Sequence, residues 1–134
     1  MVADIENYVF DTLANIVKAG WPGAFVTGEY VRSPSKFPHV SIVEADNYIS
    51  VGRLDSSPEE KYATVMYEIN VYTNDTTGKK AKAKAIIDLI DKKMYAMNFT
   101  RLSRTVVPNM EDATIYRLTA RYRAETDGKT MYKI

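Results

Sequence analysis

Apolar positions recur at helical spacing in two segments of the chain. Residues 4–18 place apolar side chains three and four positions apart, as on one face of an α-helix: Ile5, Val9, Leu13, Ile16 and Val17. Gly20 and the Trp-Pro-Gly run after it predict where this helix stops. A second helix is predicted from the turn at 74–78, a candidate N-cap region, through about Met97. Its expected buried stripe is Ala81, Ala85, Ile86, Leu89, Ile90, Met94 and Met97.

Segments rich in β-branched and aromatic residues predict strands. They are 24–32, 38–46, 61–73, 99–107 and 113–125. In 61–73 strict alternation puts Tyr67 and Ile69 on one face and Glu68 and Asn70 on the other. The same period places Val40 and Ile42 on one face of 38–46 together with Glu44 and Asp46. Residues 47–60 predict a long connection, and the short end piece TMYKI follows Asp127-Gly128.

The predicted elements occur in the order α-β-β-β-α-β-β and fit one domain spanning residues 1–134. Strands joined by turns favour antiparallel pairing, and two amphipathic helices need a sheet to cover their apolar stripes. We therefore expect an α+β fold, in which a mainly antiparallel sheet of about five strands carries two helices on one face.

Composition narrows the classes of function. Eighteen Lys and Arg oppose seventeen Asp and Glu, for a formal net charge of +1, whereas dedicated nucleic-acid binders usually have a clear basic excess. Cysteine is absent, which excludes disulfides, thiolate metal sites and a Cys nucleophile. The acidic N-terminus does not resemble a signal peptide, and no apolar run approaches the roughly 20 residues of a membrane span. We expect a soluble protein that is intracellular when made.

Candidate catalytic chemistry is sparse. The chain has one histidine, His39, which we expect to be a packed or surface residue. No serine lies in a G-x-S-x-G elbow, and no base–nucleophile pair or metal set can be assembled from the residue pattern. We therefore expect no enzymatic activity, no cofactor and no metal ion.

Charged residues supply the candidate interaction sites. Arg117, Arg121 and Arg123 share one face of the last long strand, where they either pair across strands with Glu68, Glu44 or Glu29, or face a ring lumen, DNA or an acidic protein. Lys79 and Lys80 crowd the start of the second helix, where cations oppose the helix dipole, and they are either solvated or meet an acidic partner. The candidate subunit-interface or lumen residues are Arg117, Arg121, Arg123, Lys79, Lys80, Glu44, Asp46, Arg53 and Glu68.

Three stretches carry a resemblance to a known family. They are F-P-x-V-S-I-x-E-x-D-N at 37–47, Y-E-I-N-V-Y-T-N at 67–74 and P-N-x-x-D-A-T-I-Y-R-x-x-x-R-Y-R at 108–123. With the rest of the chain, they resemble the tail-terminator (tail-completion, or minor tail or capsid) proteins of long-tailed bacteriophages and prophages. None of the stretches is a catalytic motif.

The resemblance implies a structural virion protein of the tail–neck region, assembled in the cytoplasm of a bacterial host. Such proteins form a ring, expected to be a hexamer, on the head-proximal end of the tail tube. The implied partners are further copies of the chain, the major tail tube protein and the head–neck connector or stopper. The ring stops tube polymerisation, and double-stranded DNA passes through its lumen without specific binding.

Two other functions stay open at this point. Another neck component, a stopper or head–tail adaptor, is also a small α/β ring. A nucleic-acid-binding module would use the lysine cluster and the arginine face, and its affinity would fall steeply with salt.

Overall fold

The computed structural model describes residues 4–30, 34–49, 62–108 and 112–133. Within these ranges the chain forms two helices, α1 (Glu6–Gly20) and α2 (Lys79–Ala96). The strands of the sheet are β1 (Phe25–Thr27), β2 (His39–Ile49), β3 (Ala63–Thr73), β4 (Thr100–Val107), β5 (Tyr116–Thr126) and β6 (Met131–Tyr132). The predicted α+β class and element order are confirmed, and the end piece adds β6.

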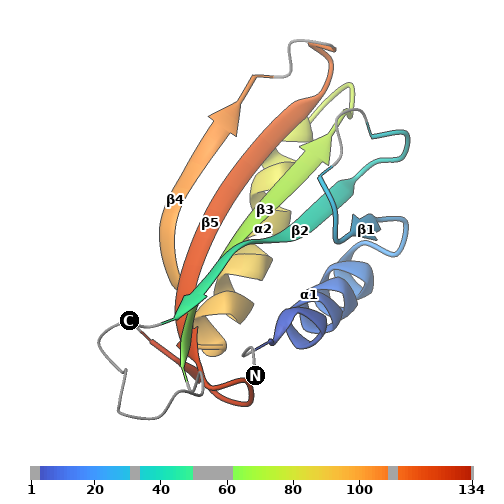
Figure 1. Cartoon of the computed structure of the whole chain (residues 1–134). Helices are drawn as coiled ribbons and strands as arrows, with labels where there is room; N and C mark the ends of the chain where they lie inside the picture. Colours follow the sequence, from blue (N-terminus) through green and yellow to red (C-terminus); the bar gives the residue numbers. More distant parts are fainter. Residues whose placement is uncertain (1–3, 31–33, 50–61, 109–111, 134) are drawn as a thin grey trace.

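One sheet collects all six strands, in the order β1-β2-β3-β5-β4, with β6 beside β5. Every pairing is antiparallel except that of β1 with β2. Figure 1 shows α2 crossing behind the middle of the sheet and α1 at the side of β1 and β2, opposite to β4. Both helices lie on the same side of the sheet, and we call the opposite side the open face.

The hydrophobic core lies between the helices and the sheet. From α1 it takes Val9, Leu13 and Val17, as the helical spacing predicted. The predicted stripe of α2 was wrong in part: Ala81 and Ala85 are exposed and Leu89 is half-buried. The buried residues of α2 are Ala83, Ile86, Ile87, Ile90 and Met94. This set also follows the i, i+3, i+4, i+7 spacing. The apolar pattern therefore allowed two neighbouring faces of α2 to be buried, and packing against β3 and β5 selected one of them.

A β-bulge in β2 overturns the expectation that Glu44 and Asp46 share a face. Glu44 is opposite Tyr67, whereas Asp46 is opposite Met66, so the pairing register shifts by one residue between them. Directly opposed residues of neighbouring strands point to the same side of the sheet. Glu44 therefore points to the helix side with Tyr67, and Asp46 points to the open face with Met66. The strand also continues to Ile49, into the stretch predicted to be a connection.

The first strand is much shorter than predicted. Of the described residues of this segment, 24–30, only Phe25–Thr27 pair with β2. The chain then leaves the sheet, and the Glu29 carbonyl accepts hydrogen bonds from the hydroxyls of Thr27, at 3.3 Å, and Ser41, at 2.9 Å. These side-chain bonds take the place of further backbone pairing.

Candidate interaction surface

The open face of the sheet carries a groove of about 350 Å³ over β3, β5 and β4. Its lining is polar apart from one valine and consists of Glu68, Ser103, Thr105, Val107, Arg117, Thr119 and Arg121. Strand alternation explains this composition on β3 and β5, because the groove residues of these strands alternate with apolar core residues. The three residues from β4 are paired with Arg117, Thr119 and Arg121 of β5 and so point to the same face. Three of the candidate residues predicted from the sequence, Glu68, Arg117 and Arg121, thus come together in one groove.

Glu68 and Arg121 form an ion pair in the floor of the groove. Both Nε and Nη2 of Arg121 donate to Oε1 of Glu68, at 3.1 and 2.9 Å. The Glu68 side chain is 8% exposed and that of Arg121 is 56% exposed, so the arginine covers a buried carboxylate. Burial raises the pKa of Glu68, but hydrogen bonds from Arg121, Tyr30 and Asn70 outweigh it and lower the pKa below its ordinary value.

Arg117 bonds to a neutral group and keeps its charge uncompensated within the groove. Its Nε donates to Oδ1 of Asn70 at 3.0 Å, and its guanidinium lies 5.6 Å from the ring centroid of Tyr72. The Thr119 hydroxyl donates to the same Asn70 oxygen at 2.7 Å. Asn70 is fully buried, and these bonds satisfy its carbonyl oxygen.

Arg123 lies on the open face beyond the ion pair, opposite Met66 of β3 and Thr100 of β4. Its Nε is buried and makes no hydrogen bond with any described residue. The arginine row predicted for β5 is therefore confirmed as a row on one face. Only Arg121 pairs across strands with a predicted acid, Glu68, among the described ion pairs.

Glu44 lies in a different environment, at the beginning of α1. The Tyr67 hydroxyl donates to Glu44 Oε1 at 3.4 Å and the Asn47 amide donates to the same atom at 3.2 Å. Burial raises the pKa of Glu44 to about 7, with the carboxylates of Glu6 and Asp4 adding to the shift. Glu44 is thus separated from the arginine row by the sheet itself.

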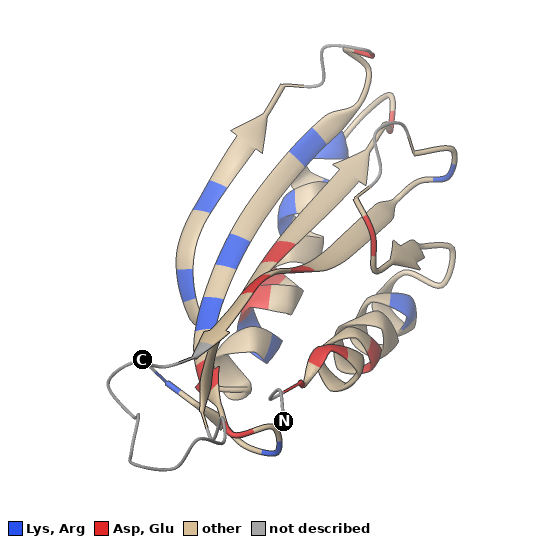
Figure 2. Ribbon diagram, viewed as in Figure 1, with Lys and Arg blue, Asp and Glu red and all other residues tan. Residues whose placement is uncertain are grey.

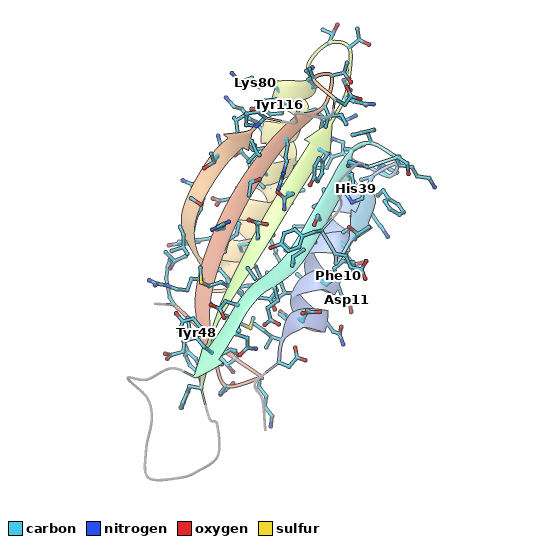
Figure 3. The ribbon with its side chains drawn as sticks, turned by 45° about the horizontal axis from the view of Figure 1, so that its top comes forward. Phe10, Asp11, His39, Tyr48, Lys80 and Tyr116 are labelled. Carbon is cyan, nitrogen blue, oxygen red and sulfur yellow. The ribbon has the colours of Figure 1, made fainter. Side chains whose placement is uncertain are left out.

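The lysines at the start of α2 are tied to nearby turns. Lys79 Nζ donates to the Thr114 carbonyl at 3.0 Å, and Lys82 pairs with Asp75 at 3.3 Å. Lys80 is exposed, and Figure 3 shows it at the end of the sheet where Tyr116 begins β5. The N-cap is Gly78 with φ +82°, within the 74–78 turn that was predicted to cap the helix, although no side chain makes a capping hydrogen bond. Arg53 lies outside the described residues.

Sequence reasoning missed β4 as a candidate surface. This edge strand is exposed along most of its length, and Leu102 and Val106 are 42% and 51% exposed. On the helix side, Arg104 pairs with Asp88 at 2.7 Å and Arg101 with Asp91 at 3.6 Å. The sequence carried no signal for these pairs, because Arg101 and Arg104, three positions apart in a strand, share a side only through the register shift between Arg101 and Ser103.

His39 is a packed residue, which is one of the two placements expected from the sequence. It is 2% exposed, between the rings of Phe25 and Tyr72 at centroid distances of 5.2 and 5.7 Å. Its Nε2 lies 3.0 Å from the Thr27 hydroxyl, and burial lowers the pKa of the imidazole. No group of three His, Asp or Glu residues in the described ranges is arranged to hold a metal ion. Neither α1 nor α2 has the length and apolar character of a membrane-crossing helix.

Comparison with known proteins adds no relative. No protein family matches the chain, and no curated protein shows significant sequence similarity to it.

Proposed function

We propose that this protein is a structural assembly protein, a tail terminator that forms a ring on the head-proximal end of a phage tail tube. The ring stops tube polymerisation and presents the surface to which the head–neck connector binds. The observation that carries the proposal is the open face with its exposed edge strand. A polar groove and an arginine row lie on the open face, and β4 at the edge of this face adds exposed apolar side chains, of which Val106 points to the helix side of the sheet.

A ring of identical subunits needs two different surfaces on each subunit, because contacts that close a ring run head to tail. This fold offers two such surfaces at opposite sides: β4 with the open face, and α1 beside β1 and β2 (Figure 1). Each surface has exposed aromatic or apolar side chains, Tyr8 on α1 and Leu102 and Val106 on β4. Aromatic and apolar groups of this kind are enriched in protein interfaces.

The nucleic-acid alternative has less support from the same surface. Of the basic groups it would use, Arg121 is engaged by Glu68, Lys79 by a backbone carbonyl and Lys82 by Asp75. Weak binding to DNA suits a ring through which DNA passes. Binding to duplex DNA in 50 mM salt would favour the alternative.

Removal of the gene from a phage that encodes this chain tests the proposal. Loss of a terminator gives tail tubes longer than normal, measured by electron microscopy. Tails of normal length beside heads that have leaked their DNA would assign the chain to a stopper or head–tail adaptor. Normal tails and filled, joined heads would exclude both functions.

A further inference from the structure

Charges are segregated across the subunit although the net charge is only +1. Figure 2 shows Lys and Arg spaced along β4 and β5, and Asp and Glu on β2, β3 and α1. Near the edge of the sheet formed by β1 and β2, and on α1 beside it, the exposed acids are Asp4, Glu6, Asp11, Glu29 and Asp46. They outnumber the exposed lysines of this region, Lys18 and Lys36. The subunit therefore has a basic side at one edge of the sheet and an acidic side at the other.

Internal pairing removes part of the charge on the basic side and leaves the rest in the groove. Arg101 and Arg104 are neutralised by Asp91 and Asp88 on the helix side. In the groove, Arg121 neutralises Glu68. Arg117 donates a hydrogen bond to the uncharged Asn70 and forms no ion pair with any described residue. The groove thus keeps a net positive charge, with the Ser103 and Thr105 hydroxyls at its β4 wall as further hydrogen-bonding groups.

The acidic side presents a matching stripe on α1. Tyr8 and Asp11 are three positions apart on the exposed face of α1, and Lys18 follows on the same face near the other end of the helix. Asp4 lies just before the helix, where its carboxylate accepts a hydrogen bond from the Glu6 N–H at 3.0 Å. Tyr8 is 54% exposed, and Figure 3 shows Asp11 on the outer side of α1, away from the sheet. The ion pairs between described residues use other acids, namely Glu68, Asp75, Asp88 and Asp91.

We infer that the groove on the open face binds a second copy of this chain through the stripe that Asp4, Tyr8 and Asp11 form at the beginning of its α1. This inference rests on the proposed ring and names the contact between its subunits. The carboxylates of the stripe face Arg117 and the exposed part of Arg121, and Tyr8 packs against the polar wall and Val107. Because the two surfaces lie at opposite sides of one subunit, each copy offers its groove to one neighbour and its α1 to the other.

Disulfide trapping tests this contact cleanly, because the natural chain has no cysteine. Full-length Asp11→Cys and Thr105→Cys proteins, both altered at exposed positions, are mixed and oxidised. We expect about tenfold more cross-linked dimer in this mixture than in either variant alone. The matched control is Lys92→Cys, exposed on α2, mixed with Thr105→Cys. Adding Arg117→Glu to the Thr105→Cys protein should reduce the yield about fivefold, whereas adding Lys92→Glu should not.

The outcomes separate this inference from the proposed function. A yield in the mixture no higher than in the controls overturns the inference, and the ring proposal survives if the unaltered protein still forms rings. If the cross-link forms but the Asp11→Cys/Thr105→Cys double variant gives open chains instead of closed rings, the contact stands and the terminator function fails. Retention of the protein on duplex DNA with no cross-link would assign the groove to nucleic acid and overturn the inference.

Discussion

Arg121 covers Glu68 by placing two of its nitrogens on one carboxylate oxygen, at 3.1 and 2.9 Å. The two residues are direct neighbours across β5 and β3, so the pair depends only on strand register. The arginine is half-exposed, whereas the carboxylate is buried, and the pair is consequently asymmetric. Loss of the arginine leaves a buried carboxylate without its ion-pair partner, whereas loss of the acid leaves an arginine that solvent reaches.

Replacing Arg121 with alanine should destabilise the protein by about 1–3 kcal/mol, because Glu68 then stays buried with only neutral hydrogen-bond donors. In a Glu68→Gln background the same change should cost less, since no buried charge is left. Urea unfolding of the four proteins in this double-mutant cycle measures the difference. Equal costs in both backgrounds would mean that the ion pair contributes nothing.

Glu44 makes stability depend on pH in the opposite sense to Glu68. Its folded pKa of about 7 is above its ordinary value of 4.5, so the folded state holds the proton more tightly than the unfolded state does. Its contribution is therefore fully present below pH 4.5 and is lost as the pH rises through 7. We expect the Glu44→Gln variant to be more stable to unfolding than the natural protein by about 1–2 kcal/mol at pH 8, and equally stable at pH 4.5. The gain at pH 8 is small because solvent screens this half-exposed group.

Thermal unfolding at the two pH values checks the Glu44 prediction, with Glu29→Gln, at an exposed position, as the control. The control should differ from the natural protein in free energy of unfolding by the same amount at both pH values. A Glu44→Gln variant that gains equally at both would contradict the account, because the effect would then not come from titration.

The phase of α2 gives a prediction about the core. Ile87 is fully buried and Leu89 half-buried, although the apolar pattern had favoured Leu89. Ile87→Ala should cost about 2–5 kcal/mol, because it leaves a cavity between α2 and the sheet. Leu89→Ala should cost less than half as much. Urea denaturation of both variants measures this order, and the reverse order would place the helix in the other phase.

Gly78 is held in the left-handed region, with φ +82°, where α2 begins. A Cβ at this position meets no atom within 4 Å, so Gly78→Ala costs only backbone strain, about 1 kcal/mol. Gly23 has equally open surroundings without a positive φ, and Gly23→Ala is expected to be neutral or slightly stabilising. Calorimetric melting temperatures compare the two, and an equal loss in both would exclude backbone strain as the cause.

Local periodicity was sufficient to predict the elements that repeat a simple pattern. The stripe from Ile5 to Val17 and the alternation of residues 61–73 gave α1 and β3, because amphipathic elements must turn one side to the core. The arginine row on β5 followed from the same alternation. The β2 bulge was not predictable, since the segment reads as a regular strand and the register shift arises in pairing with β3.

The buried polar groups of the open face also lacked a local signal. Asn70 is fully buried, and its partners Arg117 and Thr119 come from a strand more than forty residues later. Similarly, the exposure of β4 follows from its place at the edge of the sheet, which depends on strand order. Both features belong to the candidate surface, so the sequence indicated its charges but not its shape.

Electron microscopy of the purified protein, alone and mixed with tail tubes, tests the central claim most directly. The account predicts closed rings with a central opening, six subunits in each, at the ends of tubes that have stopped growing. Protein that stays monomeric at every concentration, and leaves the tube ends bare and growing, would contradict it.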